Sequence, residues 1–380
     1  MKKDKKSPRR ALRVLLVLII IGAVAFGSFT YWVSVPFVKN NAGRVKAEIL
    51  PFAEMTYEPE GPGYEKRFYQ RPGDKIHFLN TGPSDTILLE SVDENGVSIF
   101  ALVDCGEDTD YPEGKDNIIY DGYEKYVIDY IHTVAGNQGR EYRTYLDFVV
   151  GTHSHSDHIG GFDSLFADEE ITVGEVYLKK YDPIGKNMAE RSWDNEEVYG
   201  QMVGAANARG FELIQDIPSE PFTLGNMKIS FYNTGESKNN LNGGENDNSL
   251  GVLVEVNGKR AFLAGDINNW SGTEREVSKQ VGRVDLVKAG HHGHLGSGSV
   301  YFGAGLRPEH LVVTGAKVPW ISISNYAVFA KSTVYCTADL GGVIAELKED
   351  KISFYEIGEF DNSEPACAYF LAPASSEEVQ

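Results

Sequence analysis

The sequence predicts a single mixed α/β domain in which two β-sheets pack together and helices cover their outer faces. The 380 residues are 42% apolar and 24% charged, which is the composition of a globular protein. Strand-like and helix-like segments interleave from residue 74 to residue 356 instead of forming separate blocks. Neighbouring strands are joined by hairpin signals such as Asn257-Gly258, which strict β-α-β alternation would not contain. This mixture predicts two mixed sheets in one domain.

The N-terminal region differs from the rest of the chain in charge and hydropathy. Seven of the 36 cationic residues but only one of the 55 acidic residues lie in residues 1–13, so this tail carries +6 and the remaining chain −25. The uncharged run 14–33 has the length of about 20 residues that crosses a bilayer core. We expect a single-pass signal-anchor at 14–33, with the tail in the cytoplasm and the domain outside it. The alternative is a signal peptide cleaved near Ala23-Val24-Ala25, which would release a secreted protein.

The first half of the body is expected to form strands and one helix. Residues 34–73 are rich in proline, glycine and glutamate and predict a stalk or an extended wrap between membrane and domain. Short apolar runs separated by turn residues then predict strands at 76–80, 85–91 and 97–104. Helical spacing of apolar residues predicts a helix within 117–134, and LDFVVG predicts a buried strand at 146–151.

The second half continues with helices expected at 192–209 and 273–281. Strands are expected at 227–232, 250–256, 260–264, 284–289, 311–313, 333–335, 343–347 and 352–355. Residues 357–380 are a C-terminal extension with an acidic tail. The cysteines, Cys105, Cys336 and Cys367, lack metal-site spacing and are expected to be buried thiols, with a Cys336–Cys367 bridge as the alternative in an oxidising compartment.

The histidines carry the functional signal, because six of the nine lie in two short windows. The first window, THSHSDHIGG, places His153, His155, Asp157 and His158 directly after the strand expected at 146–151. Alternate side chains at a strand end can converge on one point. Imidazole and carboxylate suit Zn²⁺ best among the common ions, and Mn²⁺ or iron is also compatible. The Gly-Gly pair that follows lets the next backbone segment pass close by.

Two further polar groups follow strands expected later in the chain. Asp266 follows the strand at 260–264, and the pair His291 and His292 follows the strand at 284–289. Each group alone is a weak signal, because an aspartate at a strand end often caps a helix. Combined with the first window in this order, they predict a site for one or two divalent metal ions. We expect His77, His132 and His310 to be packed or solvated histidines.

This combination resembles the metallo-β-lactamase-fold hydrolases, whose signature is H-x-H-x-D-H. The segments IHFLNTGPSDTILLE, LVDCG, NDNSLGVLVEVNGKRAFLAGDI, DLVKAGHHGHLGSGS and VYCTADLGGVIAEL resemble in particular the hydrolase domain of ComEC-type DNA-uptake channel proteins. The resemblance covers about residues 74–356. It implies a metallo-β-lactamase-like αββα sandwich with a metal site at the edge where the strand ends meet.

The resemblance also implies a role for each matching residue. The first metal would be bound by His153 and His155, the second by Asp157, His158 and His291, and Asp266 would bridge them. We choose His291 over His292 because it is nearer the strand end, which leaves His292 beside the substrate or in the outer shell. Asp157 could alternatively orient the nucleophile.

Two departures from the family pattern affect this site. The chain has no histidine between His158 and Asp266, where many members supply a third ligand to the first metal. Water, Asp247 or Asn248 would then complete the first position. His294 stands where the ComEC-like branch usually has serine, and it is either a proton donor to the leaving group or an exposed loop residue.

The sequence therefore predicts a membrane-anchored, exported hydrolase that uses a metal-activated hydroxide. Our first interpretation is a phosphodiesterase or nuclease, in which Lys288, Lys179, Lys180 and Lys186 are candidates to hold phosphate. The alternatives are a hydrolase of a small ester, amide or cell-wall-derived substrate, and a non-catalytic tethered binding protein with a vestigial metal site. The acidic body argues against tight binding of long nucleic acid, although divalent cations would invert the charge locally. A role in competence rests on the resemblance alone.

Overall fold

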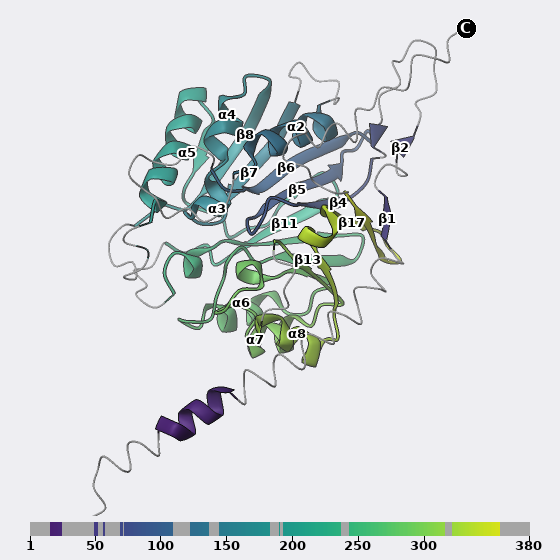
Figure 1. Cartoon of the computed structure of the whole chain (residues 1–380). Helices are drawn as coiled ribbons and strands as arrows, with labels where there is room; N and C mark the ends of the chain where they lie inside the picture. Colours follow the sequence, from purple (N-terminus) through teal and green to yellow (C-terminus); the bar gives the residue numbers. More distant parts are fainter. Residues whose placement is uncertain are drawn as a thin grey trace, which may run out of the picture.

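The computed structural model describes residues 16–24, 49–51, 56–57, 69–70, 72–108, 122–136, 144–182, 190, 193–236, 243–315 and 321–357. Two large β-sheets lie face to face, and helices cover the outer face of each (Figure 1). The predicted arrangement of two mixed sheets between helices is therefore confirmed.

The first sheet has nine strands in the order β1-β18-β17-β4-β5-β6-β7-β8-β9. In chain order they are β1 (Ile49–Pro51), β4 (Lys75–Leu79), β5 (Thr86–Val92), β6 (Ser98–Cys105), β7 (Thr144–Gly151), β8 (Ile171–Leu178), β9 (Glu212–Ile214), β17 (Gly342–Leu347) and β18 (Ile352–Glu356). The pairs from β17 to β6 are antiparallel, and the pairs from β6 to β9 are parallel.

The second sheet has seven strands in the order β10-β11-β12-β13-β14-β15-β16. They are β10 (Phe222–Leu224), β11 (Met227–Tyr232), β12 (Gly251–Val256), β13 (Lys259–Leu263), β14 (Leu286–Lys288), β15 (His310–Val313) and β16 (Thr333–Cys336). The pairs from β10 to β13 are antiparallel, whereas the pairs from β13 to β16 are parallel. The short strands β2 (Thr56–Tyr57) and β3 (Tyr69–Gln70) pair with each other.

Three apolar layers hold the sandwich together. The central layer joins the inner faces of the two sheets and includes Phe78, Val150, Val252 and Leu286, each at most 3% exposed. The outer face of the first sheet packs on α2 (Glu124–Ala135), α4 (Phe162–Ala167) and α5 (Asn195–Arg209). The outer face of the second packs on α6 (Thr273–Val281), α7 (Val300–Leu306) and α8 (Ser324–Phe329).

Most expected elements between residues 75 and 356 are present, with ends shifted by a few residues. The helix expected within 117–134 begins at Glu124 and ends at Ala135. The strands β8, β9 and β10 and the short helices α3 (Ser156–Ile159), α4, α7, α8 and α9 (Thr337–Leu340) were not predicted. These helices have four to seven residues, too few for an apolar period to stand out.

The structure tests only part of what was expected for the ends of the chain. Residues 16–24 are helical and exposed, and the rest of the expected anchor 14–33 lies outside the described residues. Within the described part of the chain, no helix combines the length and the apolar character needed to cross a membrane. In the segment 34–73, β1 pairs in parallel with β18 at the edge of the first sheet. Cys105 is a buried free thiol, Cys336 is a partly buried one, and Cys367 lies outside the described residues.

Candidate metal centre

The predicted metal-binding side chains converge at one edge of the sandwich. The segment from His153 to His158 follows β7 of the first sheet and runs into α3. Asp266 follows β13, and the His291-His292 pair follows β14, both in the second sheet. The two sheets meet here directly, because the backbone N–H of Leu250 donates to the carbonyl oxygen of Thr152 at 2.9 Å. The candidate centre therefore lies across the seam between the sheets.

Four side chains form one compact group, which we name the second position: Asp157, His158, Asp266 and His292. His158 Nε2 lies 3.1 Å from Asp266 Oδ1 and 3.9 Å from Asp157 Oδ2. His292 Nε2 lies 3.2 Å from Asp157 Oδ2 and 3.6 Å from Asp266 Oδ1. Donors held tetrahedrally at about 2.1 Å from one ion are roughly 3.4 Å apart. The spacing of this group matches that value.

His153, His155 and Asp266 form an adjacent group, which we name the first position. His153 Nε2 lies 3.0 Å from His155 Nδ1 and 4.0 Å from Asp266 Oδ2. The carboxylate of Asp266 is thus shared, with Oδ1 facing the second position and Oδ2 facing the first. The bridging role that the resemblance implied for Asp266 stays a prediction.

Buried carboxylates orient the histidines of the second position from behind. His158 Nδ1 lies 2.7 Å from Asp104 Oδ2, and Asp104 also accepts the backbone N–H of Thr152 at 2.7 Å. His292 Nδ1 lies 3.3 Å from Asp85 Oδ1 and 3.0 Å from the hydroxyl of Thr314. A ring that donates its Nδ1–H to such a partner keeps Nε2 free as a lone-pair donor, which is the arrangement that supports metal binding.

The centre holds three buried carboxylates, Asp85, Asp104 and Asp266, beside one buried lysine, Lys288. Burial lowers the pKa of His158, but the carboxylates of Asp266 and Asp104 outweigh it and raise that pKa well above its ordinary value. Burial also disfavours the charged form of His292, yet Asp266 and its neighbours raise the pKa to about 9. Lys288 is 0% exposed and forms a buried ion pair with Asp85. These carboxylates favour a cation among them.

The side chains fit a divalent metal ion. In the described part of the chain, His158 Nε2, His292 Nε2 and both carboxylate oxygens of Asp266 are buried and lack hydrogen bonds of normal geometry. Leaving such groups unsatisfied costs free energy, so a missing partner is expected. The orphan atoms are the same nitrogen and oxygen atoms that face one another in the two positions. Imidazole with carboxylate is a donor set typical of Zn²⁺ and of other first-row divalent ions.

The geometry differs from our assignment of the histidine pair. His292, and not His291, belongs to the four-residue group of the second position. His291 Nε2 instead lies 3.9 Å from Asp266 Oδ2, on the side of the first position, and its side chain is 28% exposed. His294 packs near this pair, with its ring centroid 5.3 Å from that of His291. Burial, followed by the charges of His292 and His291, lowers the pKa of His294 to about 4.

The other side chains proposed from sequence lie elsewhere. Asn248 donates to Glu245 at 3.0 Å, and Asp247 does not belong to the group at the first position. Lys288 is buried in an ion pair, so it is not placed to hold a substrate phosphate. Lys179 is 6% exposed and donates to two backbone carbonyls, each at 3.0 Å. Lys180 is exposed, and Lys186 lies outside the described residues.

The backbone packs closely around the glycine pair Gly160-Gly161, which follows the ligand segment 153–158. A Cβ on Gly161 would lie 2.5 Å from the carbonyl oxygen of Cys105, and one on Gly160 would lie 2.5 Å from Asp108 N. The expected role of the glycine pair is confirmed. Beside the window, Trp193 is 42% exposed and its ring lies 5.2 Å from that of His155.

Sequence reasoning missed the side chains that support the ligands. Asp85 and Asp104 lie at the ends of β5 and β6, and Thr314 follows β15. Asp104 in LVDCG carried the same signal as Asp266, a lone carboxylate at the end of an apolar strand. Asp85 and Thr314 carried none, because a single polar residue beside a strand is common in any turn.

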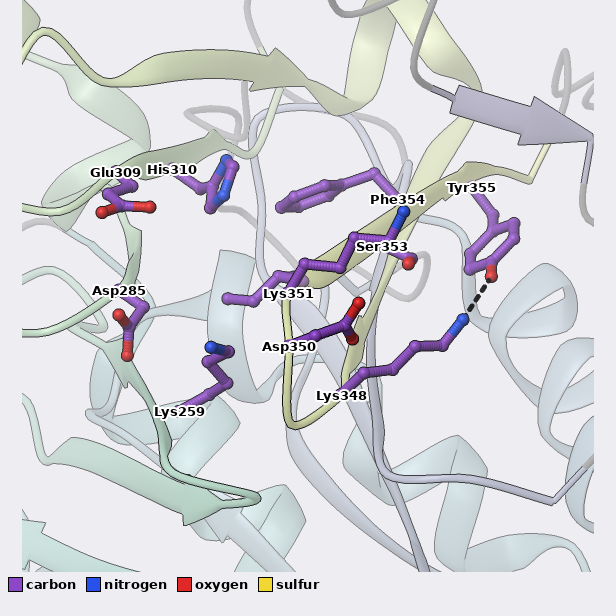
Figure 2. Close-up of a pocket in the computed structure, with 11 residues that line it drawn as sticks. Lys259, Asp285, Glu309, His310, Lys348, Asp350, Lys351, Ser353, Phe354 and Tyr355 are labelled. Atoms are coloured by element: carbon purple, nitrogen blue, oxygen red, sulfur yellow. Dashed lines mark hydrogen bonds between the residues drawn. The ribbon is translucent and has the colours of Figure 1, made fainter.

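A separate hollow of about 650 Å³ lies where β13 and β15 begin, at the ends of these strands away from Asp266. Figure 2 shows its lining side chains. It is lined by Lys259, Asp285, Glu309, His310, Lys348, Asp350, Lys351, Ile352, Ser353, Phe354 and Tyr355. Three lysines face three carboxylates there, so its charge selects neither anions nor cations. None of the candidate metal-binding residues lines it.

The sequence is similar to one known protein family and, over a short stretch, to one curated protein. The sequence model described as "Beta-lactamase superfamily domain" matches residues 102–304, more than half of the chain. A stretch of 118 residues is 26% identical to "Recombination protein 2" of Haemophilus influenzae, and this match covers 30% of the chain and 15% of that protein. The chain therefore matches only a small part of that relative.

Two solved structures illustrate the matches among proteins of known structure. The metallo-beta-lactamase fold protein YhfI from Bacillus subtilis gives a TM-score of 0.41 at 14% identity, covering 69% of this chain and 96% of YhfI. Igni18, a metallo hydrolase from Ignicoccus hospitalis, gives a TM-score of 0.35 at 12% identity, covering 74% of this chain and 99% of Igni18.

Proposed function

This chain belongs to the beta-lactamase superfamily, whose members are generally metal-dependent hydrolases, and from that premise we propose that it hydrolyses phosphodiester bonds. One observation carries the proposal: the two oxygens of Asp266 face two separate groups of donors. Two adjacent metal positions suit in-line displacement at phosphorus, because both the attacking and the leaving oxygen need stabilisation.

The side chains of the centre have separable tasks. Bound divalent ions would supply a hydroxide near neutral pH and polarise the oxygen of the scissile group. Asp104 and Asp85 hold the His158 and His292 rings with Nε2 directed at Asp266. Lys288 forms an ion pair with Asp85, and its Nζ lies 3.6 Å from Asp266 Oδ1. Its positive charge therefore offsets part of the negative charge of both carboxylates. Trp193 packs edge to face against the His155 ring, with the ring centroids 5.2 Å apart.

The substrate we propose is a short or single-stranded phosphodiester. The partial similarity to a protein named for recombination supports a nucleic-acid-like substrate. The net charge of −19 opposes salt-driven binding of long duplexes. The indoles of Trp193 and Trp270, 42% and 58% exposed, offer faces on which unpaired bases can stack.

A hydrolase of a small ester or amide is the second candidate. One observation favours it: Lys288 and Lys179, the two proposed phosphate ligands that the structure describes as buried, are both engaged with protein groups. A neutral substrate would need no cationic side chain. The metal-binding groups would serve this reaction equally well.

Anchoring in the membrane is a separate proposal and rests on the run 14–33 behind the basic tail. Extraction of membranes at alkaline pH should leave the full chain in the pellet. A soluble product whose N-terminus begins just after Ala25 would instead establish the cleaved signal peptide.

Hydrolysis assays on the purified, Zn²⁺-loaded chain test the proposed function. We expect turnover of bis(p-nitrophenyl) phosphate and a single-stranded oligonucleotide, and loss of both in Asp157→Ala. Turnover confined to p-nitrophenyl acetate or a β-lactam would favour the second candidate. Absence of bound metal in the wild-type protein would leave only the vestigial binding protein.

A further inference from the structure

The two metal positions differ in the number of side chains assigned to them. The second has Asp157, His158, His292 and Asp266 Oδ1, whereas the first has His153, His155 and Asp266 Oδ2. Of the two side chains considered for the gap, Asn248 donates to Glu245 at 3.0 Å. Asp247 is not among the carboxylates grouped with His153 and His155.

His291 lies beside the incomplete position, although it is not one of the three side chains grouped there. Its Nε2 lies 3.9 Å from Asp266 Oδ2, and His153 Nε2 lies 4.0 Å from the same oxygen. By contrast, His292 Nε2 lies 3.6 Å from the other oxygen, Oδ1. His291 and His292, although adjacent in sequence, therefore lie beside different oxygens of the Asp266 carboxylate. Among the described residues, His291 Nδ1 is buried without a hydrogen-bond partner.

An unusual backbone creates this division. His291 has φ 50 and ψ 46, and His292 has φ 49 and ψ 22, so both lie in the left-handed region that residues with a Cβ avoid. Hydrogen bonds hold the turn on both sides: His291 N donates to Gly265 O at 3.2 Å, and Ser297 Oγ donates to Gly290 O at 2.5 Å. Strained conformations of this kind persist where a functional geometry requires them.

We propose that His291 is the third imidazole ligand of the first metal position. The adjacent histidines then serve different ions, with His291 completing the first position and His292 the second. The pair replaces the histidine that the sequence lacks between His158 and Asp266. This inference rests on the proposed metallohydrolase function.

Zinc titration of the full-length chain tests the assignment independently of catalysis. The test variant is His291→Gly, because glycine adopts the left-handed backbone freely and leaves space for an added imidazole. We expect the wild type to bind two Zn²⁺ per chain by equilibrium dialysis. His291→Gly should keep one ion and weaken the other by more than the 10- to 100-fold that loss of an outer partner costs. Free imidazole should restore the weakened ion.

Two further variants serve as a positive and a negative control. His153→Ala should lose the same ion and should change the visible spectrum of the Co²⁺-loaded protein in the same way as His291→Gly. His294→Ala, which removes the neighbouring ring, should keep both ions.

Three outcomes separate the proposals. Two ions bound with wild-type affinity by His291→Gly would overturn the assignment while leaving the hydrolase intact. A single ion in the wild type would also overturn it. No ion in the wild type would refute the proposed function itself.

Discussion

Replacing Lys288 with methionine distinguishes a lysine that balances the charge of the centre from one that binds substrate. Lys288 is 0% exposed, contacts Asp85, and donates to Gly265 O at 3.0 Å. Burial alone would lower its pKa, but the carboxylates of Asp85 and Asp266 raise it, so the lysine is charged at neutral pH. Methionine keeps an apolar stem of similar length and removes the charge. Removal of one partner from a buried ion pair costs about 3–5 kcal/mol.

Metal binding should change the size of this loss. A divalent ion beside Asp266 returns positive charge to the same carboxylates, so the variant's deficit in unfolding free energy should be largest without metal and smaller with Zn²⁺. Lys75→Met is the matched control. Lys75 pairs with Glu90 at 3.0 Å, with side chains 0% and 1% exposed, outside the candidate metal-binding groups. Its loss should be of similar size but independent of Zn²⁺.

Urea denaturation followed by tryptophan fluorescence, with and without Zn²⁺, measures both effects. The reasoning would be refuted if Lys288→Met unfolded at the wild-type urea concentration and showed only a raised KM. That outcome would mean that the lysine contacts the substrate, as we first considered from sequence. A deficit that does not depend on Zn²⁺ would separate Lys288 from the metal positions.

The remaining predictions concern an outer ligand, a buried acid and a close backbone contact. Asp104→Asn should weaken Zn²⁺ binding about 10- to 100-fold in chelator competition, because Asp104 orients His158 at 2.7 Å; unchanged affinity would exclude that role. Burial raises the pKa of Glu274 from 4.5 to about 7, so the folded protein holds a proton that the unfolded chain releases. Its contribution is present below pH 4.5 and lost as the pH rises through about 7, a change of roughly 3 kcal/mol. Urea titrations of Glu274→Gln across that range should therefore show a flatter profile, and an identical slope would contradict the assignment. Gly161→Ala should lower the free energy of unfolding by about 1–3 kcal/mol, because its Cβ would lie 2.5 Å from Cys105 O; an unchanged urea midpoint would show that the backbone yields.

The sequence was sufficient for the order and type of most elements. Hairpin signals and short apolar runs located β11, β12 and β13 to within one or two residues, because hydrophobic periodicity and turn chemistry are local properties. It was insufficient for β8, whose apolar run is interrupted by Gly174, and for α7 and α8. These helices have six or seven residues and depend on packing against the second sheet.

For the metal centre, the sequence by itself determined the donor chemistry: imidazoles and carboxylates at strand ends in a fixed order along the chain. Only the tertiary structure decided how those donors divide between two positions. His291 and His292 are adjacent in sequence, and the left-handed turn that separates their rings cannot be inferred from residue types. Likewise, Asp85 and Lys288 belong to different sheets and meet only because the two sheets pack face to face. Local patterns specify what a residue can bind, whereas long-range packing specifies what it faces.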